Sequence, residues 1–369
     1  MTQTFDVAVI GAGPAGSATA LLLARQGLSV AVCDGPRRRT LSIGETLPRH
    51  ASELLRRLGL WEGFCAQSHL PSPGMMSAWG SPNVWTTDYL FSPLGNGWHL
   101  DRTKFNDLLI ETAARAGVTL LRETRVTACE KGDADWRLAT RDAHGRQKLA
   151  CHFVVDACGR TSGLSLGPMG RLVSDRLVAV ACLCMPASSA TTSSYTLVEA
   201  VDQGWFYSAL LPSGYYIVTY VTDADLHSDD RKRSIRFFED QLKKAPHTRE
   251  RTGGITSAFS IIPAFSSMRE HAADRNWLAV GDAARSYDPL SGMGLCMSMS
   301  MAIDAADAIA RRFHGDVSGL ESYELLNRQA YAEYIQAHGA CYRLEQRWPE
   351  CGFWRRRHNM SDLDNLRFT

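Results

Sequence analysis

The chain has 369 residues, of which 45% are hydrophobic and 21% charged, and its formal net charge is +1. This composition is ordinary for a globular protein, and the small net charge gives no sign of a nucleic-acid-binding or membrane-binding surface. The first residues show no basic region followed by an apolar one, so we expect no secretory signal and a cytoplasmic location. The ten cysteines are scattered without a CxxC pair, which favours reduced cysteines over a metal site.

The N-terminal segment is typical of a strand, a glycine-rich turn, a helix and a second strand. We expect the strands at 5–10 and 28–33 and the helix at 15–26. Gly11 permits a tight turn, Gly13 lets a pyrophosphate approach the backbone, and Gly16 allows the helix to pack closely on the strand. Pro14 suits the first helical turn, whose remaining N–H groups can bind phosphate. Asp34 ends the second strand at the position of a ribose-binding carboxylate, so the segment predicts a dinucleotide site.

The remaining elements follow from hydrophobic periodicity and turn residues. Helices are predicted at 50–60, 101–117, 231–244 and 295–313, with a further helical stretch over 318–358. Strands are predicted at 118–121, 125–130, 136–140, 148–155, 178–185, 195–199, 205–211, 215–221 and 277–280, with a hairpin turn at His144–Gly145. The pattern predicts an α/β fold with a second part dominated by strands between 172 and 262.

Glycine-rich turns follow three predicted strands, at 11–16, 156–163 and 281–294. One dinucleotide site explains the first turn alone. In the third turn, Asp282 could accept hydrogen bonds from ribityl hydroxyls, while Gly292 and Gly294 would let the backbone approach a flat ring. The following helix would direct its N-terminal N–H groups at that ring, which suits the negative charge of a reduced flavin.

Together these motifs resemble the FAD-dependent group A monooxygenases and their flavin-halogenase and prenyl-reductase relatives. The resemblance covers residues 1–315 and rests on GAGPAG at 11–16, DACGRTS at 156–162 and VGDAARSYDPLSGMG at 280–294. It implies a Rossmann-like FAD-binding domain of the p-hydroxybenzoate hydroxylase type, interleaved with a mixed β-sheet substrate domain and followed by a C-terminal helical segment. The FAD-binding domain is expected at 1–70, 101–175 and 265–330, the substrate domain at 71–100 and 176–264, and the helical tail at 331–369.

Carried onto this sequence, the resemblance also implies FAD contacts along several segments. The implied positions are Gly11, Gly13, Pro14, Ala15, Gly16, Asp34, Gly44, Glu45, Thr46, Arg102, Val126, Gly281, Asp282, Pro289, Gly292, Met293 and Gly294. Among them, Arg102 matches an arginine that contacts FAD from the start of a helix. The segment from Glu45 to Pro48 matches a GExxxP-like segment beside the isoalloxazine ring, and Asp288 and Pro289 would lie next to the same ring.

The activity that the resemblance implies is oxygenation of an electron-rich aromatic ring through a flavin C4a-hydroperoxide. Candidate catalytic residues are Glu45, His99, Trp205, Tyr207, Asp288 and Pro289. A carboxylate or imidazole could take the ring proton, although a lone histidine such as His99 is also typical of a structural hydrogen bond. Trp205 and Tyr207 share one face of a strand, which is either protein core or an aromatic cage for the substrate.

Two further segments are similar to the LodB/GoxB-type flavoproteins that mature tryptophylquinone oxidases: PSPGMMSAWGSP at 71–82 and GNGWHLDRTKF at 95–105. This similarity implies that the substrate is a peptidyl tryptophan in the precursor of a quinone-cofactor oxidase. Halogenation is disfavoured, because halogenases have a lysine between the GExxxP-like segment and the helix that follows it, whereas the first lysine here is Lys104.

The electron donor and the class of substrate stay open at this point. No second glycine-rich strand–helix unit occurs, so we expect NAD(P)H to bind transiently or a partner reductase to supply electrons. The alternative functions are a hydroxylase of a small aromatic compound, an FAD-dependent reductase and a non-catalytic flavin-binding maturation chaperone. The arginine and aromatic residues of 341–358 favour either a solvated terminal helix or a protein interface.

Overall fold

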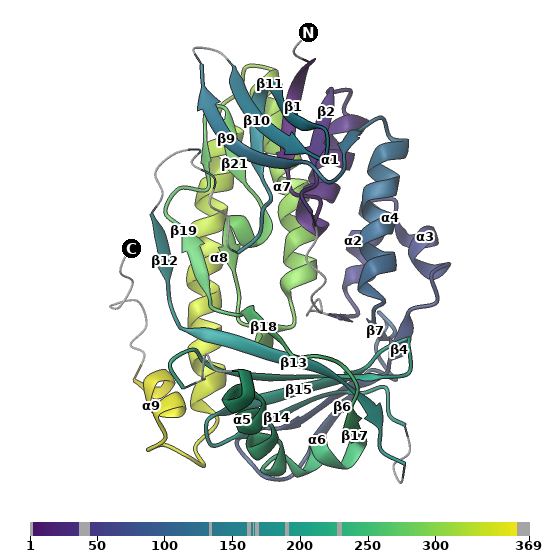
Figure 1. Cartoon of the computed structure of the whole chain (residues 1–369), viewed down its shortest axis with the longest axis vertical. Helices are drawn as coiled ribbons and strands as arrows, with labels where there is room; N and C mark the ends of the chain where they lie inside the picture. Colours follow the sequence, from purple (N-terminus) through teal and green to yellow (C-terminus); the bar gives the residue numbers. More distant parts are fainter. Residues whose placement is uncertain are drawn as a thin grey trace.

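The computed structural model describes residues 3–36, 45–132, 135–160, 164, 166, 170–188, 192–226 and 231–359, without the side chains of 3 and 231–234. Two eight-stranded sheets occupy opposite ends of the molecule, with long helices beside the first sheet (Figure 1). This arrangement confirms the predicted α/β fold with a second, strand-rich part. No helix within the described ranges is both long and apolar enough to cross a bilayer.

The first sheet has a parallel centre made of buried apolar strands. Its strands are β1 (Gln3–Ile10), β2 (Val30–Cys33), β8 (Thr119–Leu121), β9 (Arg125–Lys131), β10 (Trp136–Asp142), β11 (Gly145–Asp156), β20 (Ala273–Asp274) and β21 (Trp277–Ala279). The order is β20-β21-β11-β1-β2-β8, and β10 and β9 extend from β11 as an antiparallel ribbon. The valine and alanine residues of β1 and β2 are buried in one hydrophobic core with Ala18, Leu109 and Ala305.

Helices that are far apart in the sequence pack with one another beside this first sheet (Figure 1). They are α1 (Pro14–Arg25), α2 (Ala51–Arg57), α3 (Trp61–Cys65), α4 (Arg102–Arg115) and α7 (Gly294–Phe313). Helix α1 packs against both α4 and α7. Helix α4 begins at Asp101, whose carboxylate accepts hydrogen bonds from the N–H groups of Thr103 and Lys104. This cap directs the first residue of α4, Arg102, toward the cavity described below.

The second sheet is mainly antiparallel. Its strands are β5 (Gly74–Ala78), β6 (Trp85–Asp88), β13 (Leu177–Pro186), β14 (Thr196–Val201), β15 (Gly204–Leu210), β16 (Tyr216–Asp223), β17 (Thr252–Ile255) and β18 (Ser260–Pro263). The order is β17-β13-β16-β15-β14-β5-β6, with β18 also paired to β13 and with β14 and β5 parallel. Helices α5 (Arg231–Lys243) and α6 (Pro246–Arg251) lie beside this sheet (Figure 1). Phe238 of α5 packs against Phe206 and Tyr220 of the sheet.

Two three-stranded sheets lie between the larger ones. The first contains β3 (Thr46–Leu47), β4 (Leu70–Ser72) and β7 (Gly97–His99), and the second β12 (Arg171–Val173), β19 (Ser267–Arg269) and β22 (Arg285–Ser286). Of the segment expected at 71–100 in the substrate domain, β5 and β6 therefore join the second large sheet, whereas β7 does not.

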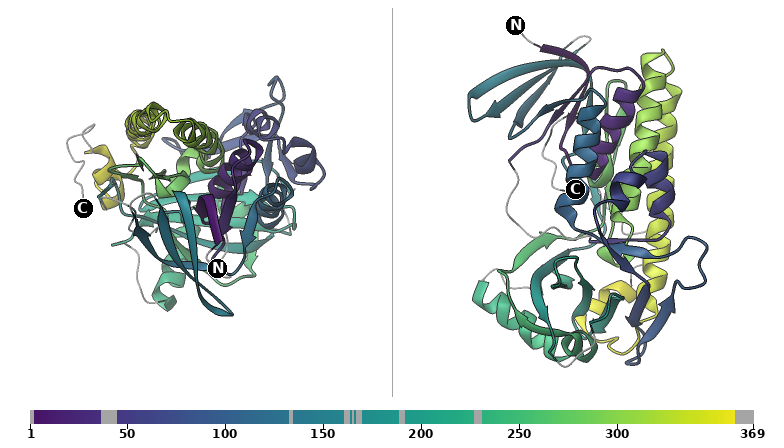
Figure 2. Two further views of the ribbon diagram at one scale, coloured as in Figure 1. Left: turned by 90° about the horizontal axis from the view of Figure 1, so that it is seen from above. Right: turned by 90° about the vertical axis from the view of Figure 1, so that its right-hand side faces the viewer.

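The C-terminal part forms two helices that connect both ends of the molecule. Helix α8 (Ser318–Arg343) packs on α7, and α9 (Gly352–His358) lies against the second sheet, as the side view also shows (Figure 2). The expected boundary at 331 falls inside α8, which continues through it. The expectation of a solvated terminal helix is wrong, because Phe353 and Trp354 are fully buried in a core cluster with strands of the second sheet.

Candidate active site

A cavity of about 430 Å³ lies between the two large sheets, where the three glycine-rich turns meet. Sequence-predicted residues in its lining are Gly13, Pro14, Ala15, Thr46, Arg102, Tyr207, Asp282, Asp288, Pro289, Gly292, Met293 and Gly294. The second turn contributes Gly159 and Arg160. The tertiary structure thus brings together side chains from segments that are more than two hundred residues apart in the sequence. Gly44 lies outside the described residues.

The first glycine turn has a different geometric requirement at each glycine. Gly11 has a φ of +108°, and a Cβ there would overlap the carbonyl oxygen of Ala157. A Cβ on Gly16 would overlap the Gly11 carbonyl and lie 2.8 Å from the Cβ of Ala157. Gly13, in contrast, has no atom of a described residue within 4 Å of an added Cβ and caps the N-terminus of α1. The open space at Gly13, in front of free helix N–H groups, fits a bound diphosphate.

The end of β2 lies beside the start of β9. Asp34 follows β2, and its carbonyl oxygen accepts a hydrogen bond of 2.8 Å from the N–H of Thr124. The buried Val126 follows two residues later on β9. Neither Asp34 nor Val126 belongs to the cavity lining, and their expected contacts with the adenosine end of FAD stay a prediction. Gly281 also lies behind the lining, where a Cβ would come within 2.7 Å of the Ala15 Cβ.

Arg102 and Glu45 bring opposite charges to the wall next to α4. Burial lowers the pKa of Arg102, while the negative charges of Glu45 and Asp282 counteract this lowering. Glu45 is 4% exposed and lies behind Thr46 rather than in the lining. The hydroxyls of Thr46 and Tyr207 form a hydrogen bond, which joins this wall to the second sheet.

Sequence analysis did not single out Arg160, although it lies within the DACGRTS motif. Its guanidinium is 3.3 Å from the carboxylate of Asp282 and donates hydrogen bonds to the carbonyl oxygens of Pro263 and Tyr287. Arg160 therefore fixes Asp282, the residue expected to bind ribityl hydroxyls, to the segment that precedes Asp288. A single arginine among the small and polar residues of this turn was the feature of the sequence that could have indicated a role in the site.

The third turn ends at a buried aspartate whose carboxylate is already occupied. Asp288 accepts hydrogen bonds from the N–H of Leu290, the Nε2 of His338 at 3.0 Å and the hydroxyl of Tyr342 at 2.7 Å. Burial raises its pKa, but the hydrogen bonds and charge of His338, with those from Leu290 and Tyr342, keep the pKa below the usual value. We therefore interpret Asp288 as an ionised anchor of the turn rather than a mobile acid or base.

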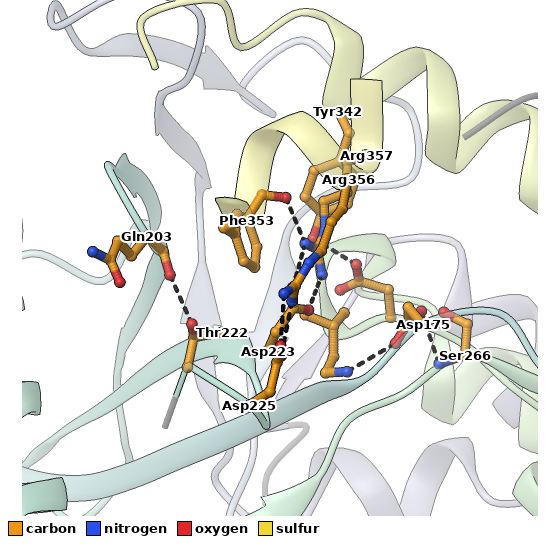
Figure 3. Close-up of polar contacts among 12 residues, drawn as sticks. Asp175, Gln203, Thr222, Asp223, Asp225, Ser266, Tyr342, Phe353, Arg356 and Arg357 are labelled. Atoms are coloured by element: carbon orange, nitrogen blue, oxygen red, sulfur yellow. Dashed lines mark hydrogen bonds and ion pairs between the residues drawn. The ribbon is translucent and has the colours of Figure 1, made fainter. Parts of the chain in front are cut away.

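Helix α9 contacts Tyr342, which holds Asp288 in place. The Arg357 guanidinium lies 5.1 Å from the ring centre of Tyr342 and donates a hydrogen bond of 2.7 Å to the carboxylate of Asp223 on β16. The neighbouring Arg356 binds Asp223 and Asp225 (Figure 3). The tail of the chain is thus connected to the third glycine turn through Tyr342.

Two expected site residues have structural roles instead. His99 is fully buried outside the cavity lining, and its two ring nitrogens bind the carbonyl oxygen of Leu210 and the hydroxyl of Thr196, both at 2.8 Å. Burial lowers the pKa of His99 to about 4, so it stays neutral. Trp205 is also fully buried in the core, with its indole N–H donated to Tyr342. Of the two residues of the proposed aromatic cage, Tyr207 belongs to the described lining and Trp205 does not. We interpret His99 as a structural residue, because both of its ring nitrogens form hydrogen bonds within the core.

The geometry of the third turn fits a flat cofactor. Gly292 has a φ of +59°, and added Cβ atoms on Gly292 or Gly294 would meet no atom within 4 Å in the described parts of the chain. Helix α7 begins at Gly294, so its first N–H groups face this open space. Together with the diphosphate space at Gly13, the residues present fit an FAD molecule that extends along the cavity.

Comparisons with known proteins agree with this fit. The sequence is 28% identical to LodB of Marinomonas mediterranea, which is described as an FAD-dependent oxidoreductase, over 98% of this chain and 99% of LodB. The fold superposes on the flavin-dependent halogenase CmlS with a TM-score of 0.85 and 26% identity, covering 99% of this chain and 69% of CmlS. It superposes on the peptidyl tryptophan dihydroxylase QhpG with a TM-score of 0.80 and 25% identity, covering 99% of this chain and 81% of QhpG.

The family assignment follows from the length of the match. A family model described as an FAD-binding domain matches residues 4–337, which is most of the chain. The chain therefore belongs to the FAD-binding-domain family and is an FAD-dependent oxidoreductase of the type that includes hydroxylases and halogenases.

Proposed function

We propose that this protein hydroxylates a peptidyl tryptophan in the precursor of a quinone-cofactor oxidase, with FAD as cofactor and dioxygen as oxidant. The similarity to QhpG, described as a peptidyl tryptophan dihydroxylase for tryptophylquinone biogenesis, extends over 99% of this chain. The similarity to LodB likewise extends over nearly the full length of both proteins. These likenesses support the proposed substrate and partner class.

The observation that carries the proposal is the composition of the cavity wall. The second sheet, including its strand β18, contributes a mainly apolar surface suited to an aromatic ring. The residues are Tyr207, Thr219, Val221, Ile262 and Pro263. Among the described lining residues there is no lysine. Because the resemblance to halogenases implies a lysine for halogen transfer, this wall favours hydroxylation over halogenation.

The residues that would hold FAD lie along the cavity and, in the case of Asp34, beyond its lining. FAD would supply the chemistry that activates dioxygen. The α1 N-terminus at Gly13 would bind its diphosphate, Asp34 its ribose, and Asp282 its ribityl hydroxyls. The α7 N-terminus beyond Gly292 would stabilise negative charge on the ring.

The wall on the second sheet would orient the substrate and exclude water. Tyr207 is held by Thr46, so its ring has a fixed position against which an aromatic substrate can pack. Glu45, whose charge acts on both Arg102 and Tyr207, is our candidate for accepting the proton that the ring loses after oxygen insertion. Glu45 is not among the described lining residues, so this role requires its carboxylate to move toward the cavity.

Electrons must come from outside the site described. We propose that NAD(P)H binds transiently or that a partner reductase delivers them. Rapid mixing of the FAD-loaded protein with NADH or NADPH, without oxygen, tests the first route by the bleaching of flavin absorbance.

The function is tested by co-expressing the protein with a candidate oxidase precursor from the same genome and measuring the intact mass of the precursor. A mass increase of one or two oxygen atoms, localised to a tryptophan by fragmentation, supports the proposal. An unmodified precursor in the presence of FAD-loaded protein, reductant and dioxygen contradicts it. If free indole or phenol then accelerates NAD(P)H oxidation, the protein is a hydroxylase of small aromatic compounds.

A matched variant separates catalysis from a chaperone role. Gly13→Ala is expected to prevent diphosphate binding without an internal clash. If this variant lacks FAD and still yields mature precursor, the role is non-catalytic.

A further inference from the structure

A hydroxyl in the cavity wall forms no hydrogen bond within the part of the chain that the structure describes. Thr219 lies on β16 directly opposite Tyr207 of β15, and its side chain belongs to the cavity lining. Thr219 is 3% exposed, and its Oγ1 forms no hydrogen bond with any described residue. Thr219 therefore carries a buried hydroxyl, without a partner among the described residues, at a position that borders the cavity.

Other threonines of this sheet show what an ordinary structural hydroxyl does. Three residues further along β16, Thr222 donates a hydrogen bond of 2.7 Å to the carbonyl oxygen of Gln203 (Figure 3). Thr196 on β14 binds His99 at 2.8 Å. A buried hydroxyl without a partner is unfavourable, so valine would be the more stable residue at a sheet position with no polar requirement.

The surroundings of Thr219 leave a ligand as the available partner. Val221, Ile262 and Pro263, which line the same wall, carry no polar side-chain atoms. The hydroxyl of Tyr207, the neighbour across the strand pair, is already bound to Thr46. A molecule in the cavity would thus meet an apolar wall with one hydroxyl at Thr219.

We propose that Thr219 is a specificity-determining residue whose hydroxyl accepts a hydrogen bond from the ring N–H of an indole-type substrate. The inference rests on the proposed function, because an apolar ring with one N–H donor is the chemistry of a tryptophan side chain. It assigns to this chain a polar anchor on the wall that faces the substrate, separate from the residues that would hold FAD.

Binding of two indole probes to the FAD-loaded protein tests the assignment without turnover. Skatole carries the ring N–H, and its N-methyl derivative lacks it while keeping the ring. Their dissociation constants are measured from the perturbation of flavin absorbance. The wild type is expected to bind skatole about three- to tenfold more tightly than the N-methyl derivative, the effect of one hydrogen bond.

Substitutions at Thr219 then separate the hydroxyl from the shape of the side chain. Thr219→Val is expected to remove the preference for skatole, and Thr219→Ser is expected to retain it. Thr219→Val without ligand should melt at an equal or higher temperature than the wild type, because it removes an unpaired buried hydroxyl. An unchanged preference in Thr219→Val, or no preference in the wild type, overturns the proposal.

Ser208 provides a matched control on the adjacent strand. Its hydroxyl is also fully buried and forms no hydrogen bond with a described residue, but Ser208 is absent from the described lining. Ser208→Ala should therefore leave the preference for skatole unchanged, and a loss of preference in this variant overturns the assignment to Thr219. A failure to hydroxylate the precursor would refute the proposed function but leave this binding readout interpretable.

Discussion

At the scale of single residues, the first turn contains glycines with separable roles. Gly11 and Gly16 have no room for a side chain, whereas Gly13 has space that the protein itself does not fill. A Cβ at Gly16 must displace backbone, since its overlap is with the Gly11 carbonyl. The same residue type therefore serves packing at one position and ligand approach at another.

This separation leads to a paired prediction. Gly16→Ala should lower the melting temperature of the FAD-free protein, because the new methyl group forces α1 away from β1 and Ala157. Gly13→Ala should leave that melting temperature nearly unchanged while weakening FAD binding, which is measured by flavin content after purification and by titration. A Gly13→Ala protein that retains full FAD affinity would contradict the placement of the diphosphate.

Asp288 is the second residue-scale case, because its charge is maintained by neighbours. Its pKa in the folded protein is below the ordinary value of 3.8. The ionised carboxylate therefore stabilises the fold at pH values above 3.8, and this contribution is lost as the pH falls through the folded-state pKa. Tyr342 supplies one of the hydrogen bonds responsible.

Tyr342→Phe should consequently destabilise the protein by about 1–3 kcal/mol at neutral pH, since it leaves hydrogen-bonding capacity at Asp288 and Trp205 unused. The deficit relative to the wild type should shrink in acid below the ordinary pKa of the carboxyl, where the wild type also loses its ionised carboxylate. Urea unfolding at several pH values measures this difference. A deficit that is independent of pH would contradict the role of Tyr342 in holding the charge.

At the scale of elements, α9 is fastened to the second sheet by two arginines in different surroundings. The Arg357–Asp223 pair is buried, with 2% and 3% of the side chains exposed, whereas 43% of the Arg356 side chain is exposed. Phe353 and Trp354 add fully buried aromatic area on the same helix. The helix is therefore an integral part of the core below the cavity, in contrast to an ordinary frayed terminus.

The two arginines form a natural comparison. Arg357→Met should cost about 3–5 kcal/mol of unfolding free energy, because it leaves the buried Asp223 with a weaker partner set. Arg356→Met should cost no more than about 1 kcal/mol, because its ion pairs are solvent-screened. Chemical denaturation of both variants checks the difference, and equal losses would show that burial does not govern this contact.

At the scale of the whole molecule, the cavity is formed by both large sheets and by the helices between them. Gly13 and Gly292 come from the FAD-binding side, and Tyr207 and Thr219 come from the second sheet. Helix α8 spans the same two parts and carries His338 and Tyr342 to the third turn (Figure 1). A ligand in the cavity is thus coupled to the stability of the entire fold.

Removal of FAD should therefore lower the stability of the whole protein in a single transition. With free FAD at one hundred times its dissociation constant, the added stability is about 2.7 kcal/mol. Thermal unfolding at increasing FAD concentrations measures the shift, and Gly13→Ala is the control in which it should be reduced. Separate transitions of the two parts, with FAD stabilising only one, would contradict the coupling.

Local patterns were sufficient to predict the glycine turns and many of the longer helices and strands, but not short elements such as α3, α6 and β19. The helix found at Pro14–Arg25 and the strands β9, β10 and β11 agree with expectation, because their signals are periodicity and turn residues within a short window. The hairpin at His144–Gly145 was predicted for the same reason. FAD was predictable because the three turns carry their backbone requirements in the identity of the glycines themselves.

The sequence by itself therefore determined the fold class, the cofactor and the segments around it. Only the tertiary structure decided what individual polar and aromatic side chains do. His99 and Trp205 are structural because Leu210 and Tyr342, 111 and 137 residues away, take their hydrogen bonds. Asp288 is fixed by two side chains of α8, which lie 50 and 54 residues further along the chain. Such partners leave no local periodic signal, since side-chain hydrogen bonds depend on which elements the packed core places side by side.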